Sequence, residues 1–214
     1  MKIIDLTHCI SQDMPVYPGT EQPKLTTANT YQKDGFKETL MTMYSHTGTH
    51  MDPPAHLYPG RTTLDDFPIE QFVGKALVID CTNVPAGKRI KMEKIRRVQE
   101  KADRADFLLF HTGWDNLWGS AAYFGDYPYI DDDVVSYIIA QKKKGVGLDV
   151  IGIDPIADED LTIHKQLFAC NEIVVIENLT NLGLVGSDLF TFCALPLKWT
   201  GADGSPIRAI ALWI

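Results

Sequence analysis

The chain lacks any long hydrophobic run. No apolar stretch among its 214 residues approaches the roughly 20 residues that a membrane-spanning helix needs. The opening residues, MKIIDLTHCI, carry polar side chains too early for a typical signal peptide. We therefore expect no membrane association and a cytoplasmic location.

Positive charge is also scarce, with 20 Lys and Arg against 28 Asp and Glu and a net charge of −8. Phosphate binding usually requires a basic face, so we expect no nucleic-acid partner. The one basic cluster, residues 88–101, is interrupted by Glu93 and Glu100. That mixture favours a solvent-exposed helix face over a phosphate site.

Cysteines are few and far apart. The four, Cys9, Cys81, Cys170 and Cys193, form no CxxC pair. This spacing predicts reduced, mostly buried thiols and argues against a disulfide framework or a thiolate zinc site.

Internal repeats, low-complexity tracts and linkers are absent, so we expect residues 1–214 to form a single domain. Short apolar runs bounded by turn residues predict strands at 76–80, 107–110, 150–154, 173–176 and 207–214. Alternation at 38–46 predicts a further strand. Helices are predicted over about 91–102 and from a cap at 131–133 to Gly145. These elements indicate a mixed α/β fold whose sheet order the pattern does not reveal.

Two segments without periodic pattern predict long loops of the kind that shape a pocket. Residues 14–23 contain three prolines and a glycine, and residues 114–128 are rich in aromatic residues and glycine. The alternative for the second segment is that its aromatic side chains only cover the edges of the core.

Histidine is scarce as well, which makes its distribution informative. Three of the six histidines, His46, His50 and His56, share residues 46–56 with Asp52. All four positions are even-numbered, so an extended segment would project them from one face. On a helix Asp52 would point about 240° away from His46, and the prolines after Asp52 forbid a helix there. Gly48 allows a positive φ or a close backbone approach.

Imidazole and carboxylate ligands suit zinc or manganese, and a carboxylate can bridge two ions. A bound divalent ion polarises a carbonyl and lowers the pKa of its water to about 7. A nearby histidine that is not a ligand can move the proton from water to the leaving group. The alternative is a chance cluster of structural histidines.

The segment 46–56 matches H-x-G-T-H-x-D-x-P-x-H and resembles the signature of the cyclase-like metal hydrolases, which include bacterial kynurenine formamidase and isatin hydrolase. Residues 5–8, 14–19, 112–114, 152–154 and 177–179 also resemble landmarks of that family. The resemblance therefore covers nearly the whole chain.

The resemblance implies a role for each matching residue. His46, His50 and Asp52 would bind one zinc ion, and Asp52 would bridge to a second. His164 would also bind that second ion, and Glu177 would complete the site by contacting both ions. His56 would be the catalytic proton-transfer residue, and manganese is the alternative metal. Without the resemblance, His164 would be interpreted as a structural histidine in a loop. We expect His8 and His111 to be structural, with hydrogen bonds to the backbone.

The resemblance further implies a swivelling β/β/α fold, a homodimer or larger homo-oligomer, and hydrolysis of a small amide. The predicted activity is arylformamidase, which converts N-formyl-L-kynurenine to L-kynurenine and formate in tryptophan catabolism. Tyr17 would contact the substrate ring at a position where formamidases often carry tryptophan, and Pro53 follows Asp52 where alanine or valine is common. Hydrolysis of isatin or another cyclic amide or lactone is the alternative.

A binding module with a structural metal is the alternative outside catalysis. Structural zinc sites are closed by four protein ligands, usually rich in cysteine. The segment 46–56 has no cysteine and carries a histidine beyond the proposed ligands, which argues against this alternative.

Overall fold

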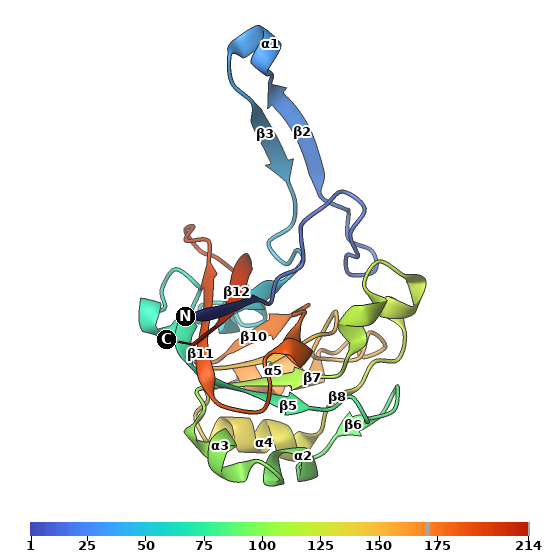
Figure 1. Ribbon diagram of the computed structural model, residues 1–214, viewed down its shortest axis with the longest axis vertical. Coiled ribbons are helices and arrows are strands. Elements are labelled where there is room, and N and C mark those ends of the chain that lie inside the picture. The colour runs from blue at the N-terminus through green and yellow to red at the C-terminus, as the bar shows by residue number, and fades with distance from the viewer. Residues whose placement is uncertain (170–171, 214) are drawn as a thin grey trace.

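A mixed β-sheet that closes on itself forms the centre of the molecule in the computed structural model (Figure 1). The structure describes residues 1–169 and 172–213. The sheet has eight strands in the order β1-β12-β11-β5-β7-β9-β10-β4, and β4 also pairs with β12. Its strands are β1 (Lys2–Asp5), β4 (His50–Asp52), β5 (Val73–Asp80), β7 (Phe107–His111), β9 (Gly145–Leu148), β10 (Val174–Glu177), β11 (Phe190–Pro196) and β12 (Ser205–Trp213). The pairing of β4 with both β10 and β12 gives the sheet a barrel-like form.

Two further strand pairs and the helices surround this sheet. The pairs are β2 (Lys24–Asn29) with β3 (Glu38–Thr42) and β6 (Arg89–Ile90) with β8 (Tyr129–Ile130). The α-helices are α1 (Tyr31–Asp34), α2 (Glu93–Arg96), α3 (Gln99–Arg104), α4 (Asp132–Ala140) and α5 (Thr162–Phe168). Short 3-10 helices are η1 (Pro54–His56), η2 (Ile69–Phe72), η3 (Trp114–Leu117), η4 (Ala121–Phe124) and η5 (Leu182–Leu184).

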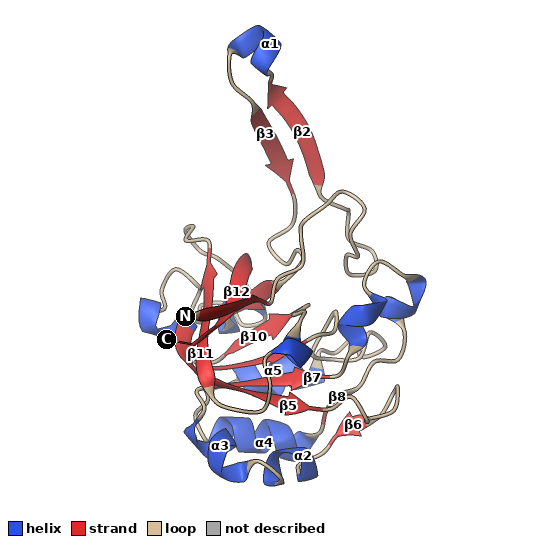
Figure 2. Cartoon of the chain, in the orientation of Figure 1, coloured by secondary structure: helices blue, strands red, loops and turns tan. Residues whose placement is uncertain are grey.

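Strands β5, β7, β9 and β10 run parallel and are covered on both faces. Successive side chains of a strand point to opposite faces. Phe107 and Leu109 of β7 therefore pack inside the barrel with residues of β11 and β12. Leu108 and Phe110 pack on the outer face with Val134 and other residues of α4. Figure 2 shows α2, α3 and α4 together along this outer side. Burial on both faces explains why these strands are continuous apolar runs in the sequence.

Most strand predictions are confirmed with small shifts at the ends. The runs at 76–80, 107–110 and 173–176 lie in β5, β7 and β10, and the run at 207–214 lies in β12 as far as residue 213. The strand predicted at 38–46 is β3, which ends at Thr42. The mixed α/β fold is confirmed.

The strand predicted at 150–154 is wrong, because these residues form a buried loop and the strand is β9. Strand β9 is not recognisable as an apolar run in the sequence, because it contains Gly145 and Gly147. A Cβ on Gly145 would lie 2.7 Å from the ring of Phe107, and one on Gly147 would lie 2.9 Å from Leu109. Glycine is therefore required where the large side chains of β7 fill the barrel.

The two predicted helices are shorter than the sequence suggested. The helix expected over 91–102 is divided into α2 and α3 at Val98, whose ψ of 24° is not helical. The second helix is α4, which begins after Asp131, where the side chain of Asp131 caps the backbone N–H of Asp132. It ends at Ala140, and Lys142 then adopts a positive φ before β9 begins at Gly145.

The three cysteines that the structure describes are free, as expected, but their burial differs from the prediction. Cys81 is buried, Cys193 is half-buried and Cys9 is exposed, so the prediction of mostly buried thiols is wrong for the described cysteines. Cys170 lies outside the described residues. In the part of the chain that the structure describes, no helix has the length and apolar character needed to cross a membrane.

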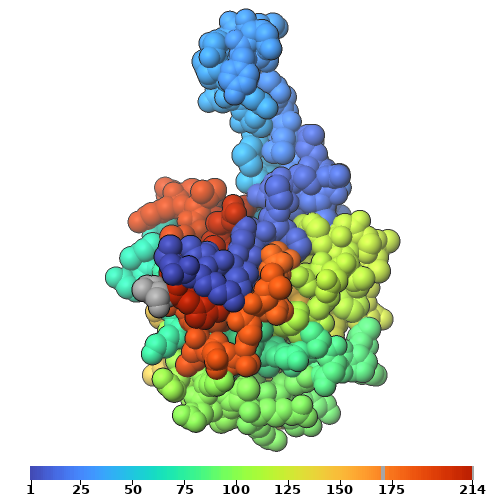
Figure 3. All heavy atoms as spheres, in the orientation of Figure 1, coloured from blue at the N-terminus to red at the C-terminus, as the bar shows by residue number. Residues whose placement is uncertain are grey.

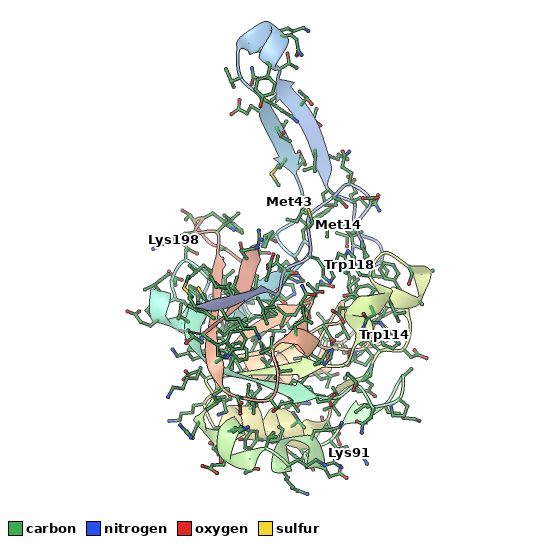
Figure 4. All side chains as sticks on the ribbon, in the orientation of Figure 1. Met14, Met43, Lys91, Trp114, Trp118 and Lys198 are labelled. Carbon is green, nitrogen blue, oxygen red and sulfur yellow. The ribbon has the colours of Figure 1, made fainter. Side chains whose placement is uncertain are left out.

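The hairpin of β2 and β3, with α1 at its tip, projects far from the barrel (Figure 3). Its two legs return to the body through residues 14–23 and 43–49, the first of which is the predicted loop without helix or strand. Figure 4 labels Met14 and Met43, which lie where the legs reach the body. The hairpin has little contact with the core, since every residue of β3 is exposed.

Candidate metal centre

Neighbouring strands β4 and β10 bring His50, Asp52 and Glu177 together at one edge of the barrel. The antiparallel register places His50 directly opposite Glu177 and Asp52 opposite Val175. His50, Asp52 and Glu177 are all at least 95% buried. Buried charges of this kind require paired or coordinated partners.

The loop before β4 positions His46. Gly48 has a φ of +67°, the left-handed conformation that favours glycine. The side chain of Asn178, which follows β10, donates a hydrogen bond to the carbonyl of Gly48 at 2.9 Å. Thr49 Oγ1 donates to the carbonyl of Asn178 at 2.6 Å. These bonds fix the loop against β10 and hold the His46 ring beside Asp52.

Helix α5 supplies His164 from a distant part of the chain. Asp154 accepts hydrogen bonds from the backbone N–H groups of Ile163 and His164 at the start of this helix. The same carboxylate lies 2.6 Å from Nδ1 of the His164 ring. The ring is thereby oriented with Nε2 toward Asp52 and Glu177, at 3.4 Å from an oxygen of each.

Asp52 joins two groups of ligand atoms. One oxygen, Oδ1, lies 2.6 Å from His46 Nδ1 and 3.3 Å from His50 Nε2. The other oxygen, Oδ2, faces His164 Nε2. Ligand atoms of His46, His50 and Asp52 lie within 4.8 Å of one another, and so do those of Asp52, His164 and Glu177. Either group could hold a divalent ion, with Asp52 shared between them.

The His56 ring lies beside these groups on η1. Its centroid is 4.0 Å from that of His46 and 6.0 Å from that of His164. Burial, which outweighs the attraction of Asp52, lowers the pKa of His56 to about 4. The ring is therefore neutral at neutral pH and able to accept a proton.

The electrostatics differ sharply between the two acids of the cluster. Although burial opposes it, His50 and His46 hold the pKa of Asp52 well below its usual range. Burial and the charge of Asp52 raise the pKa of Glu177 to about 8. Against the effect of burial, hydrogen bonds to Asp154 and Asp52 raise the pKa of His164 to about 10. Strongly perturbed groups that converge in one buried cluster are typical of functional sites.

Comparison with known proteins places this geometry in a family. Residues 4–155 match the Cyclase family. The chain belongs to this family. It is 30% identical to a kynurenine formamidase of Bacillus mycoides, over 97% of this chain and 95% of the relative. It is also 30% identical to a kynurenine formamidase of Geobacillus thermodenitrificans, over 96% and 95% of the two chains.

Solved structures agree with the sequence relatives. Isatin hydrolase A from Ralstonia solanacearum is similar with a TM-score of 0.86 and 25% identity, covering 98% of this chain and 91% of the other. A structure described as a potential metal-dependent hydrolase with cyclase activity has a TM-score of 0.78 and 31% identity, covering 98% and 96% of the two chains. The cyclase-like fold and the family resemblance predicted from the sequence are thereby confirmed.

A cavity of about 580 Å³ opens over the candidate metal centre. The loop 14–23 forms one of its walls, as predicted, and contributes Tyr17, whose side chain is 41% exposed. The aromatic loop 114–128 does not line this cavity. Its tyrosines instead support the site from below, since Tyr127 donates to the carbonyl of Asp154 at 2.6 Å and Tyr123 donates to Asn178 at 2.7 Å.

The structure brings together all five ligands and the acid–base residue proposed from the sequence, but not on one extended strand. Only residues 50–52 are in β4, while His46 lies on a loop and His56 on a 3-10 helix. His164 lies in α5 and not in a loop. Convergence therefore comes from the turn at Gly48 and from η1 as much as from alternation.

The sequence analysis assigned no role to two residues of the site, Asp154 and Asp203. Asp154 was visible only as part of the Gly152-Ile-Asp154 landmark, with no role attached. Asp203 lies 3.6 Å from Nε2 of His46 and groups with His46 and His56. Nothing in its sequence context, a loop near the end of the chain, indicated this position.

The two histidines expected to be structural lie outside the candidate centre. The His8 ring stacks on Trp118 with centroids 3.9 Å apart, and its Nε2 has no hydrogen-bond partner among the described residues, contrary to the expected backbone bond. His111 groups with Asp115 and Asp149. The oxygens of Asp149 already accept hydrogen bonds from Thr112 and Gly113, which leaves them poorly placed to bind a cation.

Proposed function

We propose that this chain hydrolyses N-formyl-L-kynurenine to L-kynurenine and formate. The observation that carries the proposal is the carboxylate of Asp52, which presents one oxygen to His46 and His50 and the other to His164, with the neutral His56 ring alongside. The chain is a metal-dependent hydrolase of amide carbon–nitrogen bonds, as its relatives over nearly the full length are.

The donor set fits zinc, with manganese as the alternative. It consists of imidazole nitrogens and carboxylate oxygens without a thiolate, and Nε2 of His46 is a buried atom with no hydrogen-bond partner among the described residues. We propose that His46, His50 and Asp52 hold one ion and that Asp52, His164 and Glu177 hold a second. When bound, such ions polarise the amide carbonyl and make water acidic enough to attack at neutral pH.

His56 is proposed as the group that moves the proton. Its neutral ring accepts a proton from the attacking water as the new carbon–oxygen bond forms. It then donates this proton to the anilide nitrogen as the carbon–nitrogen bond breaks, which releases formate and the free amine. Tyr17 at the cavity wall is proposed to contact the aromatic ring of the substrate.

The test is an assay with protein of measured metal content on N-formyl-L-kynurenine and on isatin. Release of L-kynurenine and formate that is lost on chelation and restored by zinc supports the proposal. Turnover of isatin without turnover of the formamide contradicts it.

Isatin hydrolysis is the second candidate, favoured by the structural likeness to isatin hydrolase A. A cyclic amide would use the same ligands and the same proton transfer, so the reacting groups do not separate the two substrates. A structural metal in a binding module fits less well, because the proposed ligands line an open cavity.

We also propose that the chain acts in the cytoplasm as a homodimer or larger homo-oligomer. The projecting hairpin supports the second part, since Tyr31, Phe36, Leu40 and Met41 on it are between 49% and 68% exposed. Apolar side chains exposed together on a projecting element commonly mark an interface.

A further inference from the structure

No lysine or arginine among the described residues balances the acidic side chains that line the cavity. Asp52, Asp154, Glu159, Glu177 and Asp203 contribute five carboxylates to its described wall, and no lysine or arginine is among the lining residues. A cavity lined by one sign of charge focuses the field and selects the charge of what enters.

These carboxylates fall into two layers. Asp52, Asp154 and Glu177 lie at the floor, buried and paired with histidines. Any bound divalent ions would neutralise this layer further. The floor therefore contributes little net negative charge once the site is loaded.

The second layer consists of Glu159 and Asp203 at the mouth of the cavity, and it keeps its negative charge. Glu159 is exposed and forms no ion pair among the residues that the structure describes. The side chain of Asp203 is 50% exposed, and its partners are the hydroxyl of Ser45 and the His46 ring. No lysine or arginine of the described residues forms an ion pair with either acid, so both remain available to an incoming cation.

Tyr17, the proposed contact for the aromatic ring, lies in the same field. Burial raises the pKa of its hydroxyl, and the carboxylates of Glu177, Asp154, Asp158 and Glu159 raise it further. Tyr17, Glu159 and Asp203 line the same cavity, so an aromatic substrate that reaches Tyr17 enters the field of these acids.

The proposed substrate carries both charges on that substituent, an ammonium group and a carboxylate. The ammonium group would find Glu159 and Asp203, whereas the carboxylate would meet like charges at the mouth and no lysine or arginine among the described lining residues. We infer that the cavity selects aryl formamides whose side chain carries an amine or no charge, and that a carboxylate on this side chain lowers the rate. This inference rests on the proposed function and specifies its substrate class.

The test compares three compounds that share the formanilide head. They are N-formyl-L-kynurenine, its analogue with hydrogen in place of the carboxylate, and its analogue with hydrogen in place of the amine. We expect the highest kcat/KM for the amine, an intermediate value for the amino acid, and a value about tenfold lower than the amine's for the acid. Raising the ionic strength should reduce the differences, because the mouth is exposed to solvent.

Glu159→Gln should bring the kcat/KM of the amine and acid closer together by several-fold. Asp160→Asn is the matched control, since Asp160 is an exposed neighbour that does not line the cavity. The control should retain the wild-type ratio.

The inference is overturned if the acid is hydrolysed as fast as the amine or faster, or if Glu159→Gln leaves their ratio unchanged. Failure of the proposed function gives a different result. In that case none of the three compounds, nor unsubstituted formanilide, is hydrolysed by protein that contains its metal.

Discussion

Nδ1 of His164 lies 2.6 Å from Oδ2 of Asp154, a carboxylate that also accepts the backbone N–H groups of Ile163 and His164. One side chain thus holds the start of α5 and the orientation of the histidine on it. Hydrogen bonds of this kind fix the ring nitrogen that faces a metal and raise its basicity.

Asp154→Asn should therefore weaken zinc binding by about tenfold to a hundredfold while the fold persists. The measurement is a zinc titration against a competing chelator, with circular dichroism to confirm the fold. Asp160→Asn, an exposed carboxylate a few residues away, is the control and should bind zinc normally. Unchanged zinc affinity in Asp154→Asn would show that α5 alone positions His164.

His56→Ala should lower kcat by at least about a hundredfold and leave the metal content intact, because His56 is proposed to move a proton and not to hold the ion. The checks are steady-state kinetics and elemental analysis of the same preparation. If the variant loses its metal but keeps its fold, His56 belongs to the ligand set.

The segment 46–56 could be predicted from the sequence because its information is local. Ligand residue types at matched spacing, a glycine that turns the chain and two prolines that exclude an α-helix all lie within it. The strand that became β10 was predicted from its apolar run, and the family resemblance identified Glu177 at its end as a ligand. These residues indeed meet in the structure.

The remaining parts of the fold and of the site could not be predicted, because they depend on contacts between residues that lie far apart in the sequence. The closure of the barrel through β4 and β12 joins His50 to Pro206, and no periodic pattern encodes that pairing. Strand β9 was missed because its glycines make room for Phe107 and Leu109, which lie far away in the sequence. Asp203 reaches His46 only because the chain end folds back over the cavity.

Gly204→Ala should displace the ring of the proposed ligand His46 without changing the residue itself. A Cβ at this position would lie 2.5 Å from the His46 ring. The ring is the free end of a side chain and can move, so we expect the fold to persist and zinc affinity to fall at least about tenfold, as when a ligand or its support is lost. The measurements are zinc titration and thermal unfolding.

Gly201→Ala in the same loop is the matched control for this variant. Its Cβ would meet nothing within 4 Å, although its φ of +71° costs the variant about 1 kcal/mol of stability. It should bind zinc normally. Equal zinc affinity in the two variants would contradict the proposed role of His46.

Leu40→Glu should shift the protein toward the monomer if the hairpin forms the proposed homodimer. Leu40 is 59% exposed in the isolated chain, and a buried carboxylate at an interface would lack a partner. Light scattering after size exclusion measures the change. Ile69→Glu, a similarly exposed apolar residue in η2 and away from the hairpin, is the control and should keep the oligomeric state. A Leu40→Glu variant with the wild-type mass would place the interface elsewhere.

Zinc binding should release protons and become tighter as the pH rises. In the metal-free site the pKa of Glu177 is raised to about 8 by burial and by Asp52, and that of His164 is raised to about 10 by hydrogen bonds to Asp154 and Asp52 despite burial. Both pKa values lie above 7, so Glu177 and His164 hold protons at neutral pH that an ion must displace. Each displaced proton gives about a tenfold gain in affinity per pH unit.

Competition titrations at two pH values, with calorimetry in buffers of different ionisation enthalpy, would measure at least one proton released per site. Affinity that is constant between pH 6 and pH 7.5, with no proton released, would mean that His164 and Glu177 are not ligands.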